Sequence, residues 1–169
     1  MGEKEITIAQ ALRKIKDLKG RIARHSANAM TSVTHKTNAP PAYAFGAEWE
    51  QASLLVEEML ELQTRIAIAN SKTTVDYEGK SRSLTWCTKK LAEIKGAIAW
   101  HNGLQVRAQK TTIEEEFEWA PGASSRARVA TEYTCHLPEA ERAACVRGLE
   151  TKFIDLNDLV ETENHRTRI

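Results

Sequence analysis

The side chains best suited to binding chemistry gather in the second half of the chain, where basic and aromatic residues alternate. Guanidinium groups hold phosphate oxygens through forked hydrogen bonds, and aromatic rings stack on nucleobases. These residue types predict a site for a small, nucleotide-like anion, formed by Arg107, Lys110, Trp119, Arg126, Arg128 and Tyr133. A simpler alternative, which we favour, is that Arg126 and Arg128 balance a run of glutamates across a β-hairpin.

That acidic run and the scattered histidines and cysteines are the candidates for a metal site. Glu114, Glu115, Glu116 and Glu118 could bind a divalent cation, but neighbouring strand residues alternate faces, which favours a charged edge that blocks strand addition. Cys135 and His136 would likewise point to opposite faces of a strand. We therefore predict no metal, no cofactor and no catalytic residue.

Sequence motifs of the common enzyme classes are absent. The sequence contains no P-loop, no GxGxxG dinucleotide motif, no GxSxG nucleophile motif and no HExxH zinc motif. His101 falls on the apolar seam of a predicted helix, and we interpret it as a polar layer that fixes helix register. These observations favour a non-enzymatic protein.

Length and charge set the broad class. The chain has 169 residues and a net charge of +1, which argues against a protein that coats nucleic acid or an anionic membrane. It has no apolar run long enough to span a bilayer and three cysteines outside any CxxC pair, so we predict one cytoplasmic domain over residues 1–169 with reduced thiols.

Apolar periodicity predicts a mainly α fold with four long amphipathic helices. Apolar residues recur at alternating steps of three and four in each segment, as along a coiled-coil seam. Thr7 and Gln10 have capping-box spacing at the start of the first segment. The predicted helices cover residues 5–29, 47–70, 83–109 and 138–164. We expect the core to include Ile15, Ile22, Met59, Ile66, Leu91, Ile98 and Leu156.

Charge alternates in sign along the predicted helices. The net charges are +4 for residues 5–29, −4 for 47–70, +4 for 83–110 and −2 for 138–169. Neighbouring antiparallel helices favour opposite charges along their flanks. We therefore predict an antiparallel bundle or paired helical hairpins, and such long seams favour a homo-oligomer.

A period of two predicts one β-hairpin between helices three and four, over residues 111–136. Ile113, Phe117 and Trp119 would share one apolar face with Val129 and Tyr133, and residues 120–127 would form a long loop. A lone two-stranded hairpin is marginal in water, so this face needs a cover. A smaller extended element is expected at residues 73–81, with its turn at residues 78–80.

The ends of two predicted helices resemble each other at an offset of 94 residues. Both end in the pattern apolar, apolar, Asn, Thr, apolar: Leu62, Ile66, Asn70, Thr73 and Val75 match Leu156, Val160, Asn164, Thr167 and Ile169. We interpret this as a repeated helix exit in which Asn70 and Asn164 cap the helix or adopt a left-handed conformation. The alternative is that both amides bind a shared ligand. A true repeat would mean two hairpin-like halves in one chain.

The order of these segments, from IAQALRKIKDLKGRI through LLVEEMLELQTRIAIAN and SLTWCTKKLAEIKGAIA to FIDLNDLVETEN, resembles the septicolysin-like family of small bacterial and phage-borne proteins. The resemblance implies a mainly helical protein without an established activity.

These observations favour a non-enzymatic oligomeric assembly or binding protein, phage-borne if the resemblance holds. The alternative is an oligomer that binds or sequesters a small anionic ligand, and an unrecognised enzyme comes third. We expect no membrane partner and do not favour nucleic acid.

Overall fold

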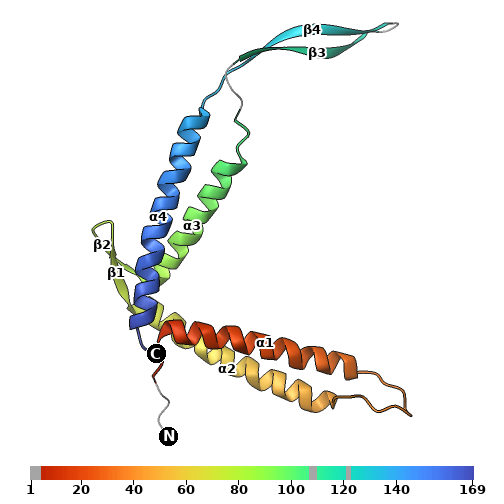
Figure 1. The fold of residues 1–169 in the computed structure, drawn as a ribbon, viewed down its shortest axis with the longest axis vertical. Helices are drawn as coiled ribbons and strands as arrows, with labels where there is room; N and C mark the ends of the chain where they lie inside the picture. Colours follow the sequence, from red (N-terminus) through yellow and green to blue (C-terminus); the bar gives the residue numbers. More distant parts are fainter. Residues whose placement is uncertain (1–4, 107–109, 121–122) are drawn as a thin grey trace. The chain divides into compact units, whose positions relative to one another are not determined.

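The chain is mainly helical, with four helices and two β-hairpins in the computed structural model (Figure 1). The structure describes residues 5–106, 110–120 and 123–169, and for 110–133 the description is of the backbone. The elements follow in the order α1 (Ile8–Ser32), α2 (Phe45–Lys72), β1 (Thr74–Tyr77), β2 (Lys80–Ser83), α3 (Leu84–Gly103), β3 (Lys110–Ala120), β4 (Ala123–Tyr133) and α4 (Glu139–Arg166).

The chain divides into two compact units. The first contains residues 1–90 and 156–169, and the second contains residues 91–155. Helices α3 and α4 contribute to both units, so the division cuts across helices and does not separate successive stretches of chain.

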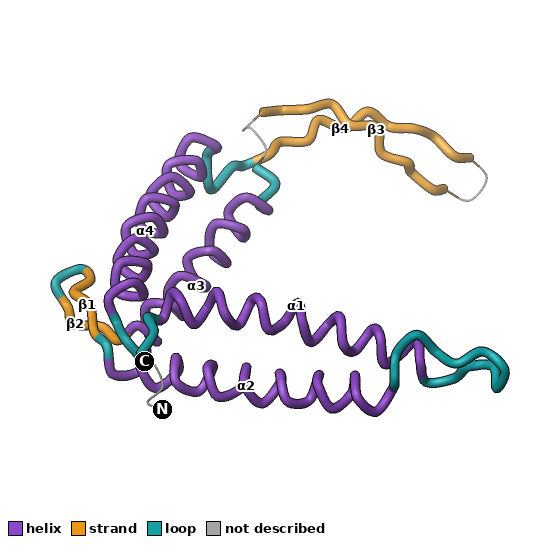
Figure 2. Tube along the Cα trace, turned by 60° about the horizontal axis from the view of Figure 1, so that its bottom comes forward, coloured by secondary structure: helices purple, strands orange, loops and turns teal. Residues whose placement is uncertain are grey.

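Helices α1 and α2 form an antiparallel hairpin within the first unit (Figure 2). The predicted capping box begins α1: Gln10 N donates to Thr7 Oγ1 at 3.2 Å, and Thr7 N donates to Gln10 Oε1 at 2.9 Å. Lys14 Nζ lies 2.6 Å from Glu58 Oε1, which fixes the level at which the two helices face each other. This arrangement matches the prediction of helical hairpins.

The predicted repeat is confirmed by equivalent backbone hydrogen bonds at the ends of α2 and α4. Thr73 N donates to Ala69 O at 2.8 Å, and Thr167 N donates to Glu163 O at 2.8 Å. The carbonyl of Thr73 then accepts from Leu84 N at 3.0 Å, as that of Thr167 accepts from Ile8 N at 3.0 Å. The end of α2 therefore meets the start of α3 in the same way as the end of α4 meets the start of α1.

Strand pairing extends this equivalence across the first unit. β1 pairs with β2 before α3, and Arg168 after α4 pairs with Thr7 before α1. Each half thus pairs its last strand with the first strand of the other half. The two asparagines play a different part from the one predicted, because both lie inside their helices, two residues before the end, and Glu78 is the only described non-glycine residue with positive φ.

The β1–β2 turn forms where the sequence predicted it. Glu78 and Gly79 have φ values of 51° and 71°, the combination that a tight two-residue hairpin turn requires. The smaller extended element expected at residues 73–81 is therefore a second hairpin, in addition to β3–β4.

The β3–β4 register corrects the predicted apolar face. Phe117 pairs with Arg126 and Glu114 pairs with Val129. Because alternate positions share a face, positions 113, 117 and 119 lie on the face opposite to positions 129 and 133. Pairing also continues to Ala120 and Ala123, so the predicted long loop is replaced by strand on both sides of residues 121–122.

In the second unit the end of α3 is held against the beginning of α4. Arg142 Nη1 donates to His101 O at 3.0 Å and to Asn102 Oδ1 at 3.3 Å, and Glu139 binds the other edge of the guanidinium group. Lys95 Nζ lies 5.7 Å from the centre of the Phe153 ring. Helix α3 ends at Gly103, six residues before the predicted end.

Burial confirms some of the predicted core and corrects the rest. Ile15, Ile66 and Leu156 are buried. The other four predicted core residues are only half-buried: Ile22, Met59, Leu91 and Ile98. A helix in a two-helix contact is covered on one side, so part of each seam stays open to solvent. Of the three cysteines, Cys87 is buried, Cys135 is half-buried and Cys145 is exposed.

The first unit should depend strongly on Leu156, whose side chain is fully buried. We expect Leu156→Ala to lower the free energy of unfolding by about 2–5 kcal/mol, because a cavity replaces the side chain. Leu159→Ala is the matched control on the same helix, where the leucine is exposed and the expected loss is under about 1 kcal/mol. Chemical denaturation followed by circular dichroism measures both, and equal losses would contradict the burial.

Candidate interaction surface

One flank of the α1–α2 hairpin carries a row of exposed apolar side chains. We call the α1–α2 apolar face the set Leu12, Met30, Val33, Phe45, Trp49 and Leu60, each between 45% and 76% exposed. Helical periodicity puts all six on the same side of the buried seam of their own helix. Leu12 and Leu60 also lie at the same level, two residues from the Lys14–Glu58 pair.

The opposite flank of the same hairpin is mainly polar. It carries the Lys14–Glu58 ion pair and the hydrogen bond from Asn28 Nδ2 to Glu48 Oε2, which is 3.2 Å long. Leu54 and Ile68, two heptads apart on α2, are its exposed apolar exceptions, 57% and 50% exposed. Exposed apolar area is therefore concentrated on one flank, which is the usual sign of a docking surface.

Charged side chains of opposite sign line the two outer edges of the hairpin. The edge of α1 that faces away from α2 is basic, and Arg13, Lys16 and Arg24 line a hollow of about 430 Å³ there. The corresponding outer edge of α2 carries the exposed Glu50 and Glu57. These edges lie on opposite sides of the helix pair, so they cannot neutralise each other within one hairpin.

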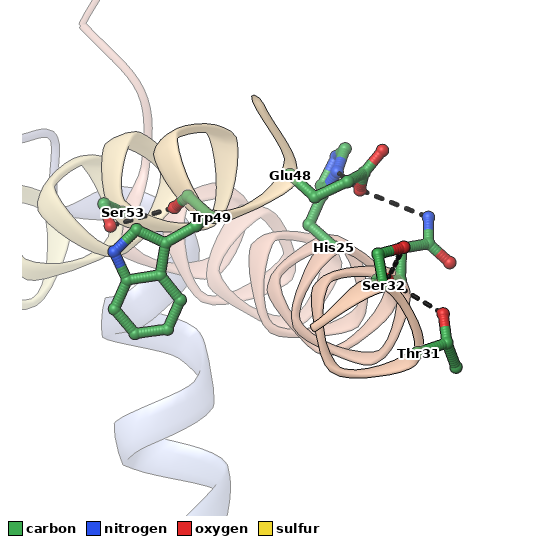
Figure 3. A network of polar contacts seen from close by, with 7 residues as sticks. His25, Thr31, Ser32, Glu48, Trp49 and Ser53 are labelled. Atoms are coloured by element: carbon green, nitrogen blue, oxygen red, sulfur yellow. Dashed lines mark hydrogen bonds and ion pairs between the residues drawn. The ribbon is translucent and has the colours of Figure 1, made fainter. Parts of the chain in front are cut away.

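A polar cluster fixes the hairpin near its loop end. His25 Nδ1 lies 2.8 Å from Glu48 Oε2, and the amide of Asn28 donates to the same oxygen. Figure 3 shows His25 and Glu48 meeting while the Trp49 indole points away from them. The cluster therefore holds α2 in the rotation that leaves Trp49, which stacks on Phe45 with ring centres 6.4 Å apart, facing outwards.

The hydrogen bond from His25 lowers the pKa of Glu48 below its ordinary value of 4.5. Burial opposes it with a smaller effect, and the Asn28 hydrogen bond adds a still smaller lowering. Both contacts favour the ionised carboxylate. Glu48 is thus a structural acid whose charge supports the helix pair.

The residues predicted to bind an anion fall at separate places on the β3–β4 ladder, apart from Arg107, which lies outside the described residues. Positions 119, 126 and 128 share one face, and Glu115 pairs with Arg128 as the charge-balance interpretation requires. Lys110 pairs with Tyr133 on the opposite face, at the other end of the hairpin. The register therefore groups Trp119, Arg126 and Arg128 and separates Lys110 and Tyr133 from them.

Other chemistry-bearing groups of the described residues are not grouped into a metal site. No cluster of three or more His, Cys, Asp or Glu side chains occurs among them. A hollow of about 290 Å³ at the base of β3–β4 is lined by Cys135 and His136, but the Cys135 thiol donates to Leu137 O at 3.2 Å. His101 is half-buried and edge-on to Trp100, with a ring-centre distance of 4.8 Å. None of the described helices is long and apolar enough to cross a membrane.

Similarity to known proteins lies in the fold. Comparison with protein-family models found no match, and comparison with curated proteins found none. A crystal structure of a functionally unknown conserved protein from Corynebacterium diphtheriae is similar over 98% of this chain and 99% of that chain, with a TM-score of 0.75 and 12% sequence identity. The fold therefore exists in a second protein of dissimilar sequence, and the septicolysin-like resemblance stays a prediction.

The signal that could have located the apolar face was present in the sequence. Leu12, Trp49 and Leu60 fall beside the heptad seams, where a globular helix pair would carry polar residues. The face that the sequence predicted to need a cover belongs to the β3–β4 hairpin, because a lone two-stranded hairpin is marginal in water.

Replacing Glu48 by glutamine should destabilise the first unit near neutral pH. A depressed folded-state pKa gives stability that is complete above the unfolded value of about 4.5 and is lost as pH falls through the lower folded value. The difference in melting temperature between wild type and Glu48→Gln should therefore shrink in acid.

Glu50→Gln is the matched control, because Glu50 is exposed on the same helix. Thermal melts of the three proteins between about pH 3 and pH 7 measure the effect, because this range brackets the ordinary pKa of a glutamate carboxyl group. A Glu48→Gln difference that is unchanged by acid would refute the assigned role.

Proposed function

We propose that this protein is a non-enzymatic oligomeric binding or assembly protein that acts through self-association. The observation that supports this most directly is the α1–α2 apolar face, six exposed apolar side chains on one flank of a helical hairpin. Exposed apolar side chains gathered on one flank of a helix pair are a usual mark of a surface that binds a partner.

The second unit and the hairpin provide further support. Trp100 and Ile154 are more than half exposed in the second unit. Among the described strands β3 and β4 pair only with each other, so two hairpin edges of eleven residues carry unpaired backbone groups. Covering such surfaces with further copies would lower the free energy of each chain.

The polar clusters described above support a structural interpretation. His25, Asn28 and Glu48 join α1 to α2, and Arg142 joins the end of α3 to α4. In the first cluster the Glu48 carboxylate is held by His25 and Asn28, and in the second the Arg142 guanidinium group is held by the end of α3. Both clusters join helices, as expected of groups with a structural role.

An oligomer that binds a small anion is the second candidate. It is favoured by one observation, the shared face of positions 119, 126 and 128 on the β3–β4 ladder. The two guanidinium groups and the indole of these residues have the chemistry to hold a phosphate and stack a base.

The purified full-length protein should have the mass of an oligomer at micromolar concentration, because exposed apolar area drives association. Light scattering gives the mass, and native mass spectrometry reports any retained anion together with subunit number. A version with residues 111–136 replaced by a short Gly/Ser linker tests whether the hairpin is a contact between subunits. If it is, the replacement should lower the subunit number. A monomeric wild-type protein would refute the proposal.

A further inference from the structure

We infer that the α1–α2 apolar face binds the same face of a second copy of this chain, giving a four-helix arrangement in which each α1 lies against the α2 of the partner. This inference rests on the proposed self-association and specifies the surface and the relative orientation of two copies.

The size of the face fits a second copy. Helix α1 has 25 residues, so it is about 37 Å long, and two adjacent helices are about 20 Å wide. The resulting footprint of about 750 Å² per copy is close to the roughly 800 Å² that each partner buries in stable interfaces. Towards the loop end of the face Trp49, the most exposed of its three α2 residues, provides the kind of aromatic anchor that dominates binding energy.

Charge selects the orientation of the partner. Residues 5–29 carry a net charge of +4 and residues 47–70 carry −4. A two-fold axis parallel to the helices places each basic α1 over an acidic α2, and every neighbouring pair of helices is then antiparallel and opposite in charge. A two-fold axis across the helices would place α1 over α1 and α2 over α2, so that like charges oppose each other.

The preferred orientation also brings together edges that are apart within one chain. Rotation about an axis parallel to the helices leaves the position of each residue along that axis unchanged. The Lys14–Glu58 and His25–Glu48 pairs show which residues of α1 and α2 have the same position along the axis, and by this measure Lys16 and Glu57 differ by about one residue. Both are exposed on outer edges. In the pair of copies, Lys16 of one chain lies beside Glu57 of the other, twice by symmetry.

The first test compares the effect on oligomeric mass of placing glutamate on the α1–α2 apolar face with the effect of placing it on the opposite flank of α2. The full-length double variant Trp49→Glu, Leu60→Glu should lose the contact and show a lower mass by light scattering, because charges replace apolar side chains at two separate levels of the face. Leu54→Glu, at a similarly exposed position on the other flank, should keep the wild-type mass. Circular dichroism should show unchanged helix content in both variants.

The outcomes separate this inference from the proposed function. An oligomeric wild type whose mass survives Trp49→Glu, Leu60→Glu overturns the surface assignment and leaves self-association in place. Loss of mass in Leu54→Glu as well would also overturn it, since the flanks would then be equivalent. A monomeric wild type overturns both the inference and the proposed function.

The orientation is tested by charge reversal. Lys16→Glu and Glu57→Lys should each raise the dissociation constant of the pair about threefold to tenfold, and the double variant should return it towards the wild-type value. Sedimentation equilibrium measures these constants. If Lys16→Glu strengthens association, or if the double variant is weaker than both single variants, the α1 helices face each other and the proposed orientation is wrong.

Discussion

The crossed backbone pairing at the helix ends is the constraint on which the first unit depends. The Thr73 carbonyl accepts from the amide that begins α3, and the Thr167 carbonyl accepts from the amide that begins α1. These bonds satisfy backbone groups that helix ends leave unpaired, and they fix where each helix starts. Ile8 and Leu84, whose amides make these bonds, are almost fully and fully buried, so apolar packing supports both junctions.

Away from these junctions each helix has fewer neighbours, and the consequences are visible in burial. The α1–α2 hairpin covers its seam, where Leu18, Leu55 and Leu62 are buried, but a pair of helices has no third layer. Residues next to the seam, such as Leu12 and Leu60, therefore remain in solvent. An exposed apolar face follows from the fold as directly as the core does, and this connects the architecture to the proposed self-association.

The polar contacts act at points where packing alone leaves freedom. Two helices that share a smooth apolar seam can rotate or slide, whereas the Lys14–Glu58 and His25–Glu48 pairs define one level and one rotation. Arg142 acts similarly by binding the carbonyl and amide oxygens at the end of α3. Exposed ion pairs contribute little free energy, so we assign these contacts a role in specifying geometry rather than in stabilising the fold strongly.

The sequence by itself determined the local elements of this protein. The four helices, the Thr7–Gln10 capping box, the tight turn at Glu78 and Gly79, and the repeated exit at Thr73 and Thr167 were all predictable, because each depends on residues close together in the chain. The tertiary structure alone decided the rest. It set the β3–β4 register that separates Tyr133 from Arg126 and Arg128, and it decided which apolar positions, Trp49 among them, stay exposed. Register and burial depend on which distant segments meet, and apolar periodicity marks a side of a helix without stating how wide a strip its neighbours cover.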